Sequence, residues 1–389
     1  MNDFDEQLRK LIHRERHNFA GNSSRAIVEL VNLIFDFAIK IRASDLHIEP
    51  FENSLRIRYR IDGHLQELHQ VLPLNLAEPL ISRIKVLARM DTTATFSPLD
   101  GAIQLGNVEM RVASMPSYGL ESLTIRLLDS TLELHNIKDL GFTAANEEIF
   151  REMINSAAGM IILTGPMNSG KSTTLYATLR ELNNPSRSIM TLEDPIEQHI
   201  EGISQVQVSE KSGLTFAAGL RAMLRMDCNV LMVGEARDAE TSKIAVRAAL
   251  TGHLILTTLH ANDSCSAVFR MLEMGVEPYL LAATLKGVVA QRLVRKICNH
   301  CGGKGCSECR STGYSGRIAL HEILYVDKGL RSLILNSRDL DEIKTLAIES
   351  GLKTLHDDAL EKVRAGLTTL EEVRRVLGTD FVKDILQPC

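Results

Sequence analysis

A glycine-rich stretch, Gly165 to Ser172, has the residue types and spacing of a phosphate-binding loop. Its sequence, Gly-Pro-Met-Asn-Ser-Gly-Lys-Ser, fits the pattern G-x-x-x-x-G-K-[ST] and follows a short apolar run that predicts a strand. In such a loop, successive backbone N–H groups and the start of the following helix point at phosphate oxygens. Lys171 would reach the β- and γ-phosphates of a nucleotide, and the Ser172 hydroxyl would bind Mg²⁺. Pattern and context together predict nucleotide binding rather than a chance turn.

Two further apolar runs end in carboxylates. Val230 to Val233 leads to Glu235, and Ile189 to Leu192 leads to Glu193 and Asp194. The carboxyl ends of neighbouring parallel strands meet at the edge of a sheet where nucleotides bind, so these side chains are expected beside the phosphate loop. Glu235 is predicted to hold Mg²⁺ or to polarise the attacking water, with Glu193 in support. For Glu193 and Asp194 the alternative is a surface turn at Glu-Asp-Pro, which the phosphate loop makes the weaker interpretation.

Four of the 7 cysteines form two C-x-x-C pairs separated by four residues. Paired C-x-x-C is a strong metal-binding pattern, and four thiolates suit tetrahedral Zn²⁺. Because all-sulfur ligation leaves no open coordination position, we assign the zinc a structural role. The alternative is a loop of reduced thiols without metal, and His300 is a substitute ligand. The predicted ligands are Cys298, Cys301, Cys306 and Cys309.

Composition places these features in a folded protein of two or three domains. The chain has 389 residues, of which 44% are hydrophobic and 24% charged, as in soluble globular proteins. The net charge is −5, so no excess positive charge is available for a nucleic acid backbone. Aromatic residues make up 4% and tryptophan is absent, which also disfavours a nucleic-acid translocase that stacks bases. Without a signal peptide or an apolar run of membrane-spanning length, a cytosolic protein is expected.

The elements that must position these residues fall into two parts. Up to about residue 130, an amphipathic helix precedes alternating strand patterns with a hairpin signal at Asp62-Gly63, so an α+β domain is expected. From about residue 142, short apolar runs alternate with helical stretches, which predicts a mainly parallel sheet with crossover helices. Roughly the last 70 residues are expected to be helical. There, Thr369 and Glu372 predict a capping box that opens a helix ending at Gly378.

Four motifs, in order along the chain, resemble those of the type II secretion and type IV pilus assembly ATPases. The motifs are Gly165–Ser172 (Walker A), Thr191–Glu197 (Asp box), Val233–Asp238 (Walker B) and Leu250–His260 (His box). The resemblance extends outward through Ser44–Pro50, Arg58–Gly63 and Gly313–Arg317. It covers the chain from about residue 25 to about residue 380.

This resemblance implies a RecA-like P-loop NTPase core with an N-terminal α+β (PAS-like) domain, a small tetracysteine zinc element and a helical C-terminal region. The expected boundaries are a polar segment at 1–22, the α+β domain at 23–130, a linker at 131–141, the ATPase core at 142–292, the zinc element at 293–317 and the helical region at 318–389. The chain is also expected to be a short form of the family that lacks most of the N-terminal docking domain.

The resemblance further implies a cytoplasmic homohexamer that hydrolyses ATP with Mg²⁺ and drives assembly of pilin or pseudopilin fibres for secretion, pili or DNA uptake. Its partners would be an inner-membrane platform protein and the pilin assembly machinery. It would associate with the inner face of the membrane through them, without direct contact with nucleic acid. One alternative is a pilus-retraction ATPase, disfavoured because retraction motors generally lack the cysteine quartet. Another is a nucleotide-binding scaffold with little hydrolysis.

The family match also implies roles for individual residues. Catalytic roles are expected for Glu235, Glu193, Lys171, Arg111, Arg126, Arg237, His260 and His253. Nucleotide contacts are expected for Gly165, Pro166, Met167, Asn168, Ser169, Gly170, Lys171, Ser172, Thr173, Arg221, Arg225, Arg270 and Arg317. Ser172 and Glu235 would hold Mg²⁺. For each arginine on a strand, an exposed strand face is the alternative reading.

Two departures from the family pattern bear on function. Met167-Asn168 stands where the family usually has Thr-Gly, so a side chain enters a turn in which glycine relieves backbone strain. Slower turnover or altered affinity is expected from this change. The family also has a longer insertion between the two cysteine pairs than the four residues present here, so the surface offered to partners is expected to be smaller.

Overall fold

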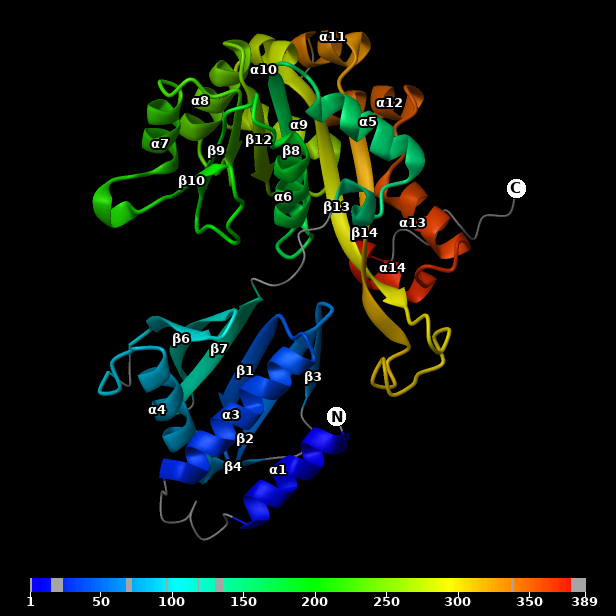
Figure 1. Ribbon diagram of the computed structural model, residues 1–389. Coiled ribbons are helices and arrows are strands. Elements are labelled where there is room, and N and C mark those ends of the chain that lie inside the picture. The colour runs from blue at the N-terminus through cyan, green and yellow to red at the C-terminus, as the bar shows by residue number, and fades with distance from the viewer. Residues whose placement is uncertain are drawn as a thin grey trace. The chain divides into compact units, whose positions relative to one another are not determined.

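A computed structural model of the protein describes residues 2–14, 24–67, 72–94, 97–117, 119–129, 136–336 and 339–378. The chain divides into two units, Met1–Glu133 and Leu134–Cys389, which are taken here one at a time (Figure 1). Part of the expected linker and the end of the expected polar segment lie outside the described residues. Among the described helices, none combines the length and the apolar character that a membrane crossing requires.

The N-terminal unit is an antiparallel sheet with helices packed on it. The strand order is β3-β2-β1-β7-β6-β5, and the short β4 pairs with β2. The strands are β1 Asp45–Pro50, β2 Ser54–Ile61, β3 His64–Glu67, β4 Leu72–Pro73, β5 Leu99–Leu105, β6 Val108–Ser117 and β7 Leu120–Asp129. The helices are α1 Asn2–Arg14, α3 Ser24–Lys40 and α4 Ala77–Leu87, with a 3-10 turn η1 at Leu74–Leu76. The predicted mixture of helix and antiparallel strand is therefore observed.

Apolar and charged residues alternate along β2, which gives the sheet one apolar face and one charged face. Leu55, Ile57, Tyr59 and Ile61 are buried in the core beneath the helices, and the arginines between them lie on the opposite face. Successive side chains of a strand point to opposite faces, so one face is apolar and the other charged. The hairpin signal after β2 is confirmed, since Asp62-Gly63 has positive φ values of 50° and 80° and leads directly into β3.

The C-terminal unit is built on a sheet with strand order β10-β9-β11-β12-β8-β13-β14. All neighbouring pairs are parallel except β13 and β14. The strands are β8 Gly159–Thr164, β9 Ile189–Glu193, β10 Ser204–Gln207, β11 Val230–Val233, β12 Leu254–Leu259, β13 Leu285–Ile297 and β14 Tyr314–Tyr325. The predicted mainly parallel sheet is confirmed.

Helices cover both faces of this sheet. They are α5 Ala144–Ile154, α6 Lys171–Leu182, α7 Phe216–Met223, α8 Ala239–Leu250, α9 Ser264–Glu273, α10 Pro278–Thr284, α11 Lys328–Asn336, α12 Leu340–Glu349, α13 Leu355–Arg364 and α14 Leu370–Leu377, with 3-10 turns η2 Ile137–Leu140 and η3 Glu210–Ser212. On β8, Met160 and Ile162 join the core formed with α7 to α12, whereas Ile161 and Leu163 join the core formed with α5 and α6. A strand buried on both faces reads as a continuous apolar run, which is why β8 was recognisable in the sequence.

The expectation that the chain is helical from residue 318 is wrong for its first part. β13 and β14 form a long antiparallel hairpin, so 318–325 is strand and the helices begin at Lys328 (Figure 1). Buried polar residues interrupt the apolar pattern of β14 and hide the strand. Glu322 accepts from the Ser264 N–H of α9 at 2.8 Å. The His321 ring stacks on Phe142 with centroids 3.8 Å apart, and its backbone N–H donates to Asp358 of α13 at 2.8 Å.

Half of the predicted capping box forms at the start of α14. The Thr369 hydroxyl accepts from the Glu372 N–H at 3.2 Å, and Gly378, with a φ of 95°, ends the helix as expected. The Glu372 carboxylate does not reach back, because Arg295 and Arg375 bind it at 2.7 and 2.6 Å. Burial acts to raise the pKa of Glu372, but these two arginines outweigh it and lower the pKa to about 2. Glu372 thus links α14 to Arg295 of β13 and does not complete the capping box.

Candidate functional site

The predicted phosphate loop forms the turn between β8 and α6. Gly165 and Gly170 have positive φ values of 147° and 88°. A Cβ on Gly165 would lie 2.5 Å from the carbonyl oxygen of Gln291, so the loop packs too closely on β13 for a side chain there. Because α6 begins at Lys171, the free N–H groups of its first turn face the loop. Ser172 and Thr173 are exposed in this turn, where hydroxyls are available to a cation.

The residues that replace the family's usual Thr-Gly lie at the outer part of the loop. Met167 is 82% exposed. Asn168 has a φ of 62°, in the left-handed region that glycine adopts without cost. Asparagine tolerates this conformation better than most residues, so the loop keeps its turn with a non-glycine residue at this position.

The Lys171 ammonium lies inside the loop. Its Nζ donates to the carbonyl oxygens of Gly165 and Pro166 at 2.8 and 2.9 Å. Burial lowers the pKa of Lys171 to about 8; the negative charge of Glu235 acts to raise this pKa, and the positive charge of Arg292 acts to lower it. A phosphate oxygen entering the loop would compete with the two carbonyls for the same cation, and its negative charge would raise the pKa of Lys171.

Glu235, Arg237 and His260 meet at the first residue of the loop. Glu235 Oε2 accepts from Arg237 Nε at 2.8 Å, and its Oε1 lies 3.2 Å from His260 Nε2. The other ring nitrogen of His260 is 3.2 Å from the Gly165 carbonyl oxygen. The hydrogen bond that Arg237 donates to Glu235, together with the negative charges of Glu235 and Asp194, raises the pKa of Arg237. The structure therefore brings Lys171, Glu235, Arg237 and His260 together from three separate segments: the start of α6, the turn after β11 and the end of β12.

Glu193 lies at the expected edge of the sheet but faces inward. It is 3% exposed, and its carboxylate accepts hydrogen bonds from Tyr176, from Thr191 Oγ1 at 2.5 Å and from Gln205 Nε2 at 3.1 Å. The Tyr176 hydroxyl in turn accepts from the backbone N–H groups of Glu197 and Gln198 at 3.1 and 3.3 Å. This network ties α6 to the turn after β9, and it leaves Asp194 as the exposed carboxylate of that turn.

Other predicted residues have their described contacts outside the loop. His253 precedes β12, and its carbonyl bonds the N–H of Gly159 at the start of β8. His253 and His260 therefore lie at opposite ends of β12, roughly 23 Å apart at 3.3 Å per residue. Arg221 pairs with Glu240 and Arg270 with Glu273, while Arg225 donates to the Arg221 carbonyl. Arg317 is exposed on β14.

Arg111 and Arg126 belong to the N-terminal unit and are direct cross-strand partners on β6 and β7. Arg126 Nε pairs with Asp45 at 3.1 Å, and Arg111 Nε pairs with Glu109 at 3.2 Å. Both lie on the charged face of the sheet, and Asp45 also pairs with Arg60 at 3.4 Å. The two arginines proposed from the family match thus share one surface of this unit.

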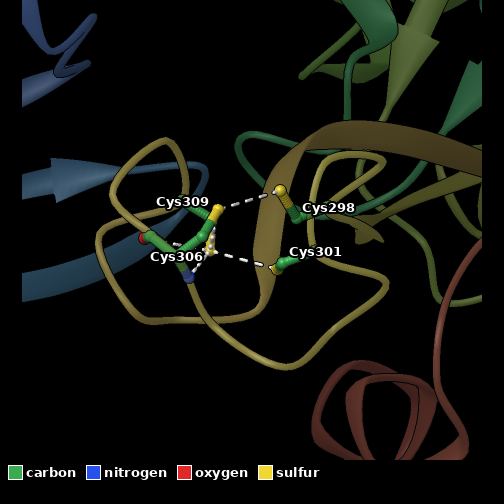
Figure 2. A group of neighbouring side chains, drawn as sticks. All are labelled: Cys298, Cys301, Cys306 and Cys309. Atoms are coloured by element: carbon green, nitrogen blue, oxygen red, sulfur yellow. Dashed lines mark hydrogen bonds between the residues drawn. The ribbon is translucent and has the colours of Figure 1, made fainter.

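The four cysteines gather at the tip of the β13–β14 hairpin (Figure 2). Their sulfur atoms all lie within 4.8 Å of one another. The Sγ atoms of Cys298 and Cys306 are 3.9 Å apart, and Cys309 lies 3.7 Å from both Cys301 and Cys306. A tetrahedral zinc ion with sulfur ligands at about 2.3 Å places those sulfurs about 3.8 Å apart. The donor set and its spacing therefore fit Zn²⁺.

Backbone N–H groups point at two of these sulfurs. Gly305 donates to Cys301 Sγ at 3.2 Å, and Cys306 and Gly313 donate to Cys309 Sγ at 3.2 and 3.3 Å. Burial acts to raise the pKa of Cys309, but the two backbone donors and the neighbouring thiols lower it to about 6. A backbone hydrogen bond acts to lower the pKa of Cys306, but desolvation and the neighbouring thiols raise it to about 11, so the backbone of the tip favours the metal-binding thiolate at Cys309 in particular.

Four residues of the site have no counterpart among the sequence predictions, and two of them come from β13. Gln291 and Arg292 line the phosphate loop, and Arg292 Nη2 also donates to the Asn262 carbonyl at 2.7 Å. Tyr176 and Gln205 were likewise missed. One signal was available for Gln291, because an uncharged polar residue directly follows the apolar run Val288-Val289-Ala290. A buried polar side chain of that kind needs a specific partner.

Comparison with known proteins gives consistent matches. A family described as Type II/IV secretion system protein matches residues 21–375. A type II secretion system ATPase E of Vibrio cholerae is 44% identical over 380 residues, which cover 90% of this chain and 75% of that protein. The type IV pilus assembly ATPase PilB of Thermus thermophilus is 41% identical over 362 residues, covering 85% and 41% respectively. Among solved structures, the pilus retraction motor PilT with bound ADP has a TM-score of 0.64 and 27% identity, covering 88% of this chain and 95% of that chain.

Proposed function

The chain belongs to the type II/IV secretion system protein family, and on that premise we propose that it is an ATPase that powers the assembly of pilin or pseudopilin fibres. The observation that carries the proposal is the meeting of Lys171, Glu235 and His260 at the phosphate loop. A cation for the phosphates and a carboxylate for Mg²⁺ or water are the parts that phosphoryl transfer to water requires. ATP with Mg²⁺ is the proposed substrate.

We propose roles from the family motifs and from the contacts of the loop. Lys171 and the amides of the loop hold the phosphates, and Ser172 binds Mg²⁺. Glu235 supports Mg²⁺ through water and polarises the attacking water. Arg237 and His260 orient the Glu235 carboxylate through its two oxygens. The contacts of Glu193 favour a role in fixing the turn that carries Asp194. The remaining family-matched residues, Arg111, Arg126, Arg221, Arg225, Arg270, Arg317 and His253, are proposed to act at interfaces of the assembled protein.

The proposed assembly is a homohexamer on the cytoplasmic face of the inner membrane. There it would work with a platform protein and the pilin or pseudopilin machinery, bound to the membrane through these partners. A retraction motor is the second candidate, supported by the match to PilT, but the cysteine cluster and the higher identity to a secretion ATPase favour assembly. A nucleotide-binding scaffold is the third, supported by the replaced Thr-Gly pair of the loop.

Steady-state ATP hydrolysis by the purified chain with Mg²⁺, measured across protein concentration, tests the proposal. We expect the rate per subunit to rise with concentration and to level off as the ring assembles, because arginines from one subunit would then complete the site of another. Size-exclusion chromatography at each concentration provides the matching assembly state. Nucleotide binding with no hydrolysis at any concentration would refute the motor and favour the scaffold.

We further propose that the cysteine cluster binds one structural Zn²⁺ per chain. Removal of the metal with a chelator, or a Cys306→Ser substitution, is expected to speed amide hydrogen exchange in residues 298–313 at least tenfold, because the tip is held by the metal. Metal content is measured by mass spectrometry of the intact protein. Cys228→Ser is the control: this buried thiol lies outside the cluster and its loss should leave one zinc bound. A chain that is purified without zinc and exchanges equally with and without chelator would contradict the proposal.

A further inference from the structure

Gln291 places a polar side chain in the buried part of β13, directly beside the phosphate loop. β13 pairs in parallel with β8 as far as Ala290 and Thr164. β8 ends at Thr164 and is followed by the phosphate loop, whereas β13 continues for seven more residues. Gln291 therefore lies beside the loop and not beside β8. The side chain is 2% exposed. A group this deeply buried needs partners of its own.

Both ends of the Gln291 amide have a partner near the nucleotide end of α6. Its Nε2 donates to the backbone carbonyl of Ser169 at 2.9 Å, and its Oε1 accepts from the Thr174 hydroxyl at 2.8 Å. Thr174 is fully buried in the first turns of α6. One side chain therefore joins the end of the loop to the helix that follows it.

The bond to Ser169 fixes the peptide plane between Ser169 and Gly170. In a trans peptide the C=O and the N–H point in opposite directions. Because the carbonyl is held toward β13, the Gly170 N–H is directed away from β13, to the side of the loop on which backbone amides meet phosphates. A Cβ on Gly170 would lie 2.6 Å from Gln291 Nε2, so the side chain packs directly against this peptide.

We propose that Gln291 is a positioning residue for the nucleotide, which holds the Ser169–Gly170 peptide in the orientation that binds the phosphates of ATP. The inference rests on the proposed function, because it assigns a nucleotide to the loop. Only an amide of this length supplies the donor for Ser169 and the acceptor for Thr174 together. Glutamate lacks the donor and methionine lacks both groups, so either would leave the Ser169 carbonyl unpaired and free the peptide to rotate.

The test is the affinity of the full chain for Mg·ADP, measured by calorimetry for the wild type, Gln291→Met and Gln291→Glu. Both substitutions keep the length of the side chain. We expect the Kd to rise about tenfold in each, which is the effect of losing one well-placed interaction. A residue that served stability alone would behave differently: its loss would lower the fraction of protein that binds, with the Kd of that fraction unchanged.

Thr178→Val is the matched control. Thr178 is also buried on α6, but its hydroxyl donates to the Thr174 carbonyl of its own helix, so the Kd for Mg·ADP should stay at the wild-type value. Should both Gln291 variants fail to fold, Thr174→Val removes one of the two bonds that hold the amide and is expected to raise the Kd several-fold. An unchanged Kd in the folded Gln291 variants, or in Thr174→Val where those do not fold, would overturn the inference.

Failure of the proposed function gives a different result. A wild type that binds Mg·ADP but hydrolyses no ATP would refute the motor, and the ratio of variant to wild-type Kd would still decide the role of Gln291. A wild type that hydrolyses ATP, with Gln291 variants that bind Mg·ADP equally well, would refute only the positioning role. A wild type that binds no Mg·ADP would overturn both.

Discussion

Glu235→Gln is expected to lower the kcat for ATP hydrolysis at least 100-fold while the Kd for Mg·ADP changes by less than about threefold, in line with the usual contribution of a catalytic base. The substitution keeps the length of the side chain and removes its negative charge. Glu235 is the only carboxylate among the described residues that the structure brings within hydrogen-bond distance of His260 at the loop. Without this charge, the attacking water would not be polarised and Mg²⁺ would lose a supporting carboxylate. The contacts of Lys171 and the loop amides with the phosphates would persist.

The control for this prediction is Glu349→Gln, which removes a carboxylate from the exposed end of α12 and should leave kcat unchanged. Single-turnover measurements separate the chemical step from product release. A Glu235→Gln protein that folds, binds Mg·ADP and hydrolyses ATP at the wild-type rate would contradict the role given to Glu235. Transfer of that role to Asp194, the exposed carboxylate after β9, would then be the next hypothesis to examine.

Lys171→Ala is expected to raise the Kd for Mg·ADP by about 100-fold or more, because hydrogen bonds to a charged group contribute about 1.5–3 kcal/mol each and Lys171 can direct more than one at phosphate oxygens. The fold should tolerate the change, since burying the ammonium costs free energy, as the lowered pKa of about 8 shows. Calorimetric titration with Mg·ADP and a thermal melt measure the two effects separately. Lys328→Ala, at the exposed start of α11, is the control.

The same pKa gives the Lys171 prediction a dependence on pH. Phosphates bind the protonated lysine, and with a pKa of about 8 in the protein alone, a growing share of the chains carries the neutral amine above pH 8. The Kd for Mg·ADP should therefore rise up to about tenfold per pH unit between pH 8 and 9.5 in the wild type and stay level in Lys171→Ala. Equal pH dependence in both proteins would show that another group is responsible.

The sequence was informative where burial and backbone geometry restrict the residue types. β8 is apolar on both faces, and the loop after it needs glycine at two crowded positions, so the strand, the loop and the start of α6 were all predictable. Glu235 was predictable for a related reason, because a short apolar strand leaves its first polar residue at the carboxyl edge of the sheet. The spacing of the cysteines predicted a cluster that the structure forms.

The other features of the fold and the site depend on contacts between segments that are distant in the sequence, and a local sequence pattern holds no information about such contacts. β14 carries two buried polar residues, Glu322, which bonds α9, and His321, which stacks on Phe142, so its apolar pattern is broken and the sequence predicts helix over 318–325. Glu193 follows a strand just as Glu235 does, but Tyr176 and Gln205 turn its carboxylate inward. His253 shares a motif with His260, yet the length of β12 separates them. Such partners become visible only once the topology is known.

The β13–β14 hairpin also sets the distance between the phosphate loop and the cysteine cluster. Gln291 at the phosphate loop and Cys298 at the tip are seven residues apart along one edge of the same hairpin, roughly 23 Å at 3.3 Å per residue. Antiparallel pairing with β14 runs along nearly all of that span. A cobalt ion at the proposed zinc site would therefore lie at a separation from a labelled nucleotide that the hairpin sets. That separation can serve as a ruler against which other distances between labels in the protein are calibrated.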